Sequence, residues 1–231
     1  MITIPHFERS PYPYILLSSL IIGGLVSCLL MRRDKIKKEH IALIELLNLV
    51  CTVLMSMLFA GTNFFKIGTL GFDGVGGAVG LVGGTVTSCF IFKDRWKSIL
   101  SSCMVPAPLM YSLAKIGCLL AGCCRGFEYD GRFSIIYEGK NFFPAQPTDF
   151  AVFFIVFLMV LIMKLRSWDG KKVALMVIIE AGIARFLTDF LRLSHEGKVL
   201  SFRQIVIIFA IGIAIIFNMI LAKKNKEKDN G

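Results

Sequence analysis

The stretch VALMVIIEAGIARFLTDFLRL, residues 173–193, decides the fold, because it is long and apolar enough to cross a membrane yet carries charge. Arg185, Asp189 and Arg192 follow one another at i, i+4 and i+7, which places all three on one stripe of a helix. A charged side chain at membrane depth costs roughly 3 kcal/mol or more, so it needs partners and usually a function. The pattern predicts a membrane protein that handles an anion, and the nearest available anion is a phospholipid phosphate.

The composition of the whole chain also indicates a membrane protein. Of the 231 residues, 55% are hydrophobic and 18% are charged, whereas soluble domains carry about a quarter charged residues. Several apolar runs reach the roughly 20 residues that a helix needs to cross a bilayer. The net charge of +10 does not indicate nucleic-acid binding, because the basic residues cluster in short segments between apolar runs. Such clusters orient membrane proteins and meet anionic lipid at the cytoplasmic face.

We therefore predict an all-α integral membrane protein with about seven transmembrane helices. The expected spans are about 14–31, 41–60, 74–92, 98–120, 148–165, 172–192 and 204–222. With these spans, sixteen lysines and arginines lie in the segments on one side and seven lie on the other. The positive-inside rule places the sixteen in the cytoplasm. The N-terminus is then outside and the C-terminus inside, which requires an odd number of spans.

The chain is expected to form a single transmembrane domain over residues 1–222, followed by a charged cytoplasmic tail at 223–231. The largest outer segment, about residues 121–147, predicts a small extracytoplasmic cap with one short strand at FSIIY, residues 133–137. In the third span, GVGGAVGLVGG predicts close helix packing, or room for a ligand against the backbone. Pro106 and Pro108 predict a kink in the fourth span.

The charged residues of the sixth span allow a functional and a structural interpretation. In the functional one, Arg185 and Arg192 grip phosphate through their planar guanidinium forks, and Asp189 holds an arginine in position. In the structural one, Arg185 pairs with Asp189 and Arg192 extends to the membrane interface.

Lys115, near the end of the fourth span, has the same two interpretations. Together with Arg125 it would add to the anion site, or it would pair with Glu45 or Glu180. Those two intramembrane glutamates would serve a proton or ion path, or would only neutralise basic residues.

Cysteine and histidine give weaker signals. Cys123 and Cys124 would act as a nucleophile or, in the absence of a neighbouring histidine, play a structural role or form a disulfide. His195 follows the arginine stripe by three residues and is a candidate general base, or a plain loop histidine. The sequence has no zinc-type arrangement of Cys and His pairs, so neither a metal nor a cofactor is expected.

At these residues the chain resembles the prolipoprotein diacylglyceryl transferases, enzymes of the bacterial inner membrane. Four stretches carry the resemblance in the family's order: GFDGVGGAVG (71–80), KIGCLLAGCCRG (115–126), FPAQPTDF (143–150) and ARFLTDFLR (184–192). The second lies at the place of the signature R-x-G-N-F-x-N-x-E-x-x-G, with Lys115, Cys118 and Cys123 in place of its arginine, first asparagine and glutamate. The third is similar to H-P-x-Q-x-Y-E. The fourth is similar to F-R-x-x-x-E-x-x-R, with Asp189 for the glutamate.

The resemblance implies transfer of a diacylglyceryl group from phosphatidylglycerol to a cysteine thiol of a prolipoprotein, or to a related acceptor, at the outer leaflet of the bacterial cytoplasmic membrane. It implies catalytic roles for Arg185, Lys115 and Asp189. Substrate-binding roles fall on residues of the matched motifs and the last span: Arg192, Gly76, Gly77, Gly117, Gly122, Gly126, Arg125, Gln146 and Gln204.

The expected partners are phosphatidylglycerol, a lipobox-containing prolipoprotein and membrane lipids, with no nucleic acid. The alternative is a non-catalytic or transport-type membrane protein that binds an anionic lipid on the same scaffold. The missing signature asparagine and glutamate favour this alternative.

Overall fold

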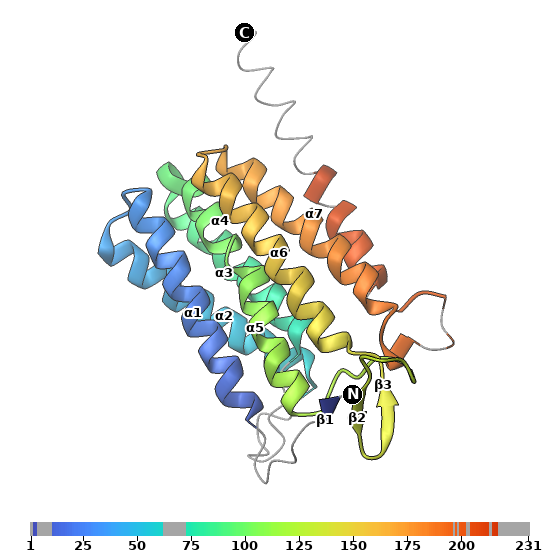
Figure 1. Cartoon of the computed structure of the whole chain (residues 1–231). Helices are drawn as coiled ribbons and strands as arrows, with labels where there is room; N and C mark the ends of the chain where they lie inside the picture. The colour runs from blue at the N-terminus through green and yellow to red at the C-terminus, as the bar shows by residue number, and fades with distance from the viewer. Residues whose placement is uncertain are drawn as a thin grey trace. The chain divides into compact units, whose positions relative to one another are not determined.

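The computed structural model describes residues 2–3, 11–61, 73–195, 197, 199–201, 204–212 and 214–216 (Figure 1). The chain is mostly helical, as predicted. Within the described residues, five helices are long and apolar enough to cross a membrane: Tyr12–Arg33, Lys38–Phe59, Gly74–Ile91, Lys93–Leu120 and Ala145–Leu165. They correspond to the first five predicted spans.

The helices at the sixth and seventh predicted spans are not both long enough and apolar enough to count as candidate membrane spans. Helix α7 (Gly170–Asp189) is long enough, but it carries charge at Lys171, Lys172, Glu180, Arg185 and Asp189. The last apolar helix, Gln204–Ile216, is shorter, and the rest of its predicted span lies outside the described residues. The charged tail at 223–231 lies outside them as well.

The chain divides into two compact units, each of which is described by itself. Unit 1 comprises Met1–Leu16, Ser112–Val156 and Leu175–Gly231, and unit 2 comprises Leu17–Tyr111 and Phe157–Ala174.

In unit 2, α2 (Lys38–Phe59) and α3 (Gly74–Ile91) run side by side (Figure 1). Gly76, Gly80 and Gly84 of α3 face α2, and a Cβ on Gly80 would lie only 2.2 Å from the carbonyl oxygen of Cys51. Small residues at a spacing of four allow two helix backbones to approach this closely. The predicted close packing of the glycine-rich helix is therefore confirmed.

The kink predicted in the fourth span appears in the structure as a break between two helices. Helix α4 (Trp96–Met104) ends just before Pro106, and α5 (Ala107–Leu120) begins just after it. Proline has no amide hydrogen and clashes with the preceding turn, so the helix cannot continue through it undisturbed.

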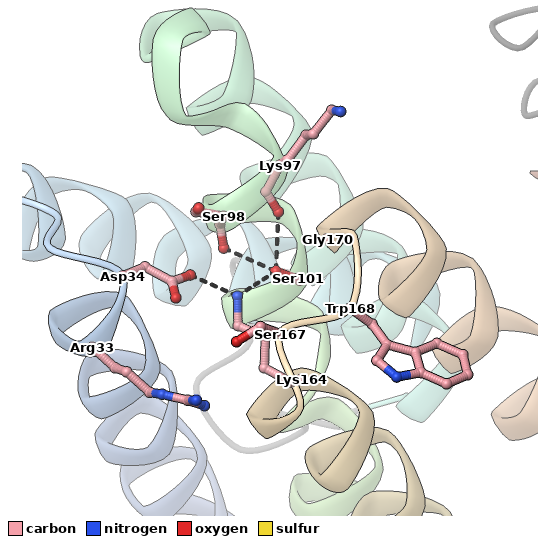
Figure 2. Close-up of a pocket in the computed structure, with 9 residues that line it drawn as sticks. All are labelled: Arg33, Asp34, Lys97, Ser98, Ser101, Lys164, Ser167, Trp168 and Gly170. Atoms are coloured by element: carbon pink, nitrogen blue, oxygen red, sulfur yellow. Dashed lines mark hydrogen bonds and ion pairs between the residues drawn. The ribbon is translucent and has the colours of Figure 1, made fainter.

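Three basic loops meet at one end of unit 2 (Figure 2). Lys164 Nζ lies 2.6 Å from Asp34 Oδ2, and Lys97 Nζ lies 3.1 Å from Asp169 Oδ2. Arg33 donates at 2.7 Å to a backbone carbonyl at the end of α6 (Ala145–Leu165). The end of α1 (Tyr12–Arg33), the first half of α4 and the end of α6 with the loop after it therefore lie together around a polar pocket of about 280 Å³.

The predicted cap segment, which belongs to unit 1, contributes to a small three-stranded sheet, in a chain that is otherwise helical. Its order is β1 (Ile2–Thr3), β2 (Ile135–Tyr137) and β3 (Lys140–Phe142). Strand β1 pairs with β2 in parallel, and β2 and β3 form an antiparallel hairpin. Glu138 and Gly139 both have positive φ, at 50° and 78°, as the tight hairpin turn requires. The strand predicted at 133–137 is thus confirmed from residue 135 onward.

Candidate active site

The signature segment forms the end of α5, where the helix terminates in a Schellman turn. Gly122 has a φ of 65°, the left-handed conformation that glycine adopts without steric cost. The amide of Cys123 donates to the carbonyl of Cys118 at 3.1 Å, and the amide of Gly122 donates to that of Leu119 at 3.2 Å. This pair of bonds defines the Schellman motif. The turn folds the chain back so that Cys123 lies against Cys118.

Three thiols gather at this turn. The sulfur atoms of Cys118, Cys123 and Cys124 all lie within 4.8 Å of one another. Cys124 has a φ of 56°, so two left-handed residues in close succession curl the chain around the helix end. All three cysteines are unbridged in this structure. Hydrogen bonds from the neighbouring thiols, together with the charges of Lys115 and Arg192, hold the pKa of Cys124 below its ordinary value.

Side chains from the cap and the start of α6 fix the thiol turn by binding its backbone carbonyls. Tyr137 donates at 2.9 Å to the last turn of α5. Arg125 Nε donates to the carbonyl of Gly122 at 2.8 Å, and Gln146 Nε2 donates to that of Cys123 at 2.7 Å. Gln146 is only 1% exposed. Its predicted role in substrate binding stays a prediction; the contact observed is with the turn.

A buried aspartate, Asp149, forms ion pairs with two of the predicted cations. Asp149 Oδ2 accepts a hydrogen bond from Arg192 Nη2 at 2.5 Å and lies 3.4 Å from Lys115 Nζ. The three residues are 2%, 3% and 5% exposed, respectively. Among the described residues, the ion-pair partner of Lys115 is therefore Asp149, and not Glu45 or Glu180, the acids that the structural interpretation offered.

Arg192 contacts Asp149 from the segment that follows helix α7. Helix α7 ends at Asp189, three residues before the predicted end of the span, so the single helical stripe through residue 192 was also wrong. Arg192 instead forms an antiparallel bridge with Gly126, the last residue of the signature segment. Because Arg192 is buried against Asp149, it does not extend to the interface as the structural alternative expected.

Arg185 and Asp189 form the expected ion pair within α7, at 2.7 Å. The other oxygen of Asp189 accepts from Ser201 Oγ and lies 3.9 Å from His195 Nδ1. Arg185 Nη1 is buried and has no hydrogen-bond partner among the described residues. Arg185 therefore keeps donor capacity for a ligand.

Gln204 and the signature glycines support the local packing. Gln204 is fully buried and joins the last helix to α7 by donating to the carbonyl of Phe186 at 3.1 Å. A Cβ on Gly126 would lie 2.4 Å from the carbonyl oxygen of Phe143, and one on Gly117 would lie 3.1 Å from the ring of Tyr12. Gly76 and Gly77 belong to unit 2.

Asp149 and Ser201 are the site residues that the sequence analysis missed. A signal for Asp149 existed, because it is an acid three residues after Gln146 at the start of an apolar span, where charge requires a reason. With Asp149 included, Lys115, Arg185 and Arg192 face two carboxylates, Asp149 and Asp189. Counted over these five described residues, three cations face two carboxylates in buried surroundings, which suits an anionic ligand.

Comparisons with known proteins agree with the motifs. The family described as prolipoprotein diacylglyceryl transferase matches residues 1–220. Phosphatidylglycerol–prolipoprotein diacylglyceryl transferase 2 of Clostridium perfringens is 33% identical over 181 residues, covering 72% of this chain and 66% of that protein. A phosphatidylglycerol–prolipoprotein diacylglyceryl transferase of Clostridium tetani is 28% identical over 153 residues, covering 60% and 61%. The aligned parts span slightly less than two thirds of these relatives.

Proposed function

Since the chain belongs to the prolipoprotein diacylglyceryl transferase family, we propose that it transfers the diacylglyceryl group of phosphatidylglycerol to a cysteine thiol of a prolipoprotein or a related acceptor. The observation that carries this proposal is the buried cluster of Lys115, Arg185 and Arg192, which forms ion pairs with Asp149 and Asp189 among the described residues.

The chemistry needs such a cluster because the leaving group is anionic. Attack of a thiolate on the glyceryl carbon breaks a carbon–oxygen bond, and the departing glycerol phosphate gains negative charge as the bond breaks. Donors that are already oriented toward that charge lower the barrier without reorganising. Arg185 binds the phosphate through its remaining donors, Lys115 adds positive charge, and Asp189 orients Arg185 through their ion pair.

The proposed topology has seven spans, with the cap outside and the basic loops in the cytoplasm of a bacterial cell. The contacts in unit 2 support it, because the end of α1, the start of α4 and the end of α6 lie together, as they must if all three are on the same side (Figure 2). The rule that basic loops stay inside then places this end in the cytoplasm. A single domain over 1–222 and a cytoplasmic tail at 223–231 complete the proposal.

The test is transfer of labelled diacylglycerol from phosphatidylglycerol to a lipobox peptide by the purified full chain. Arg185→Lys keeps the charge but loses the planar fork, so we expect transfer to fall roughly a hundredfold. The matched control is Arg132→Lys on the exposed cap, which we expect to leave transfer unchanged. If Arg185→Lys transfers at the parental rate, Arg185 does not bind the phosphate as proposed.

A second candidate function is binding of an anionic lipid without catalysis. It is favoured by Cys118 and Cys123, which replace the asparagine and glutamate of the family signature. Parental protein that binds phosphatidylglycerol vesicles but yields no modified peptide would support it over the transferase.

A further inference from the structure

The three-thiol group at the end of α5 has no role in the mechanism above, yet it is built as a site. Cys118 is fixed on the last turn of the helix, and the Schellman turn places Cys123 and Cys124 beside it. The side chains of Arg125 and Gln146 stabilise the turn by donating hydrogen bonds to its backbone carbonyls. Three sulfur atoms on a backbone that is fixed in this way form a preorganised set of soft ligands.

The spacing of the sulfur atoms fits a zinc ion. Tetrahedral zinc–sulfur bonds of about 2.3 Å separate the ligand sulfurs by about 3.8 Å. The sulfurs of Cys118, Cys123 and Cys124 lie within 4.8 Å of one another, so binding zinc would bring each pair closer by at most about 1 Å. The group contains no fourth Cys, His, Asp or Glu ligand from the described residues. Three protein ligands with one open position is the arrangement of a catalytic zinc site rather than a structural one.

The surroundings match the charge of such a site. Three thiolates around Zn²⁺ leave one net negative charge. Arg192 bridges Gly126, two residues after Cys124, and shares the carboxylate of Asp149 with Lys115, so two cations face one carboxylate there. Two of the three thiols, Cys118 and Cys123, stand where the family signature has asparagine and glutamate.

We propose that Cys118, Cys123 and Cys124 bind a zinc ion whose open position takes the acceptor thiol and activates it for transfer. The metal site stands on the thiol geometry alone, whereas the acceptor role rests on the proposed function.

The step balances without a further reactant. The acceptor thiol loses its proton to water as its sulfur binds the zinc ion. The sulfur electron pair then forms a carbon–sulfur bond to the glyceryl carbon of phosphatidylglycerol. The carbon–oxygen bond to phosphate breaks, and its electron pair leaves with glycerol phosphate. No atom is oxidised or reduced, which suits zinc because it has no redox chemistry.

The first experiment measures bound metal in the purified full chain by mass spectrometry, as isolated and after incubation with zinc. We expect roughly one zinc ion per chain. Cys118→Ser, Cys123→Ser and Cys124→Ser should each lose most of it, while Cys51→Ser, a free thiol in α2 of unit 2, should keep it. A zinc-free parental protein, copper in place of zinc, or zinc content unchanged by all three substitutions would overturn the site.

The second experiment uses cobalt in place of zinc in the parental protein, which avoids any variant that fails to fold. Sulfur-to-cobalt charge-transfer bands should appear, and a lipobox cysteine peptide should shift the visible bands while the matching serine peptide should not. If the protein transfers lipid yet the cysteine peptide leaves the bands unchanged, the acceptor role is wrong and the proposed function stands. If the bands shift but no transfer occurs, thiol binding stands and the proposed function fails.

Discussion

Asp149→Asn should destabilise the protein strongly, because it removes the shared anion from between two buried cations. The gross Coulomb attraction between Asp149 and Lys115 at 3.4 Å is about 5 kcal/mol, for an effective dielectric constant of about 20. Desolvation offsets part of this. Removing one partner of a buried ion pair nevertheless costs about 3–5 kcal/mol, because the other charge stays buried without compensation. Here Arg192 loses the same partner, so we expect the upper end of that range.

The measurement is equilibrium unfolding in mixed micelles of a mild detergent and SDS. Asp169→Asn is the matched control, because it breaks the partly exposed ion pair with Lys97 and should cost at most about 1 kcal/mol. Adding Lys115→Met to Asp149→Asn removes one uncompensated charge and should restore about 1–3 kcal/mol. The reasoning is refuted if Asp149→Asn costs no more than the control, or if the double variant is no more stable than Asp149→Asn alone.

Three further predictions follow from other contacts. Lys115→Arg should keep or raise transfer from labelled phosphatidylglycerol, because a guanidinium retains the charge and offers more donors to phosphate; a tenfold loss, roughly, would count against an anion-site role. Gly80→Ala should lower the free energy of unfolding by about 1–3 kcal/mol in the same measurement, because its Cβ would clash with the backbone of α2. Gly83→Ala is the control: its Cβ would meet none of the described atoms within 4 Å, so the substitution should be neutral or stabilising. In intact cells an impermeant thiol reagent should label the Glu138→Cys variant more than the parental protein, and should label the Lys171→Cys variant no more than the parental protein. Extra labelling of Lys171→Cys would contradict the topology.

The sequence predicted most of the local structure because local rules decide it. Apolar runs of about 20 residues predicted five helices that the structure contains, and Pro106 predicted the break between α4 and α5. The glycine-rich stretch of the third span predicted close helix packing, and α3 does approach α2 closely. The pair of Arg185 with Asp189 also followed from spacing, because residues four apart on a helix are neighbours.

The end of α7 and the hairpin in the cap were harder to predict. Helical spacing placed Arg192 on the stripe of Arg185, but the helix ends at Asp189 and Arg192 pairs with Gly126 instead. That pairing joins segments more than sixty residues apart, and no local pattern in either segment encodes it. Strand β2 was anticipated, whereas its partner β1 comes from the start of the chain.

The sequence by itself determined that buried cations, an apolar helical frame and three cysteines near one glycine exist in this protein. Only the tertiary structure decided which acid neutralises which base. Asp149 lies 43 residues from Arg192 along the chain. Several basic residues could form an ion pair with it, and the sequence does not say which of them lies nearby. The three-thiol group also depends on both sequence and tertiary structure. Gly122 allows the left-handed turn locally, whereas hydrogen bonds from Arg125, Tyr137 and Gln146 stabilise that turn in the folded chain. Spacing sets which side chains share a helix face, whereas distance between separate segments depends on how the whole chain packs.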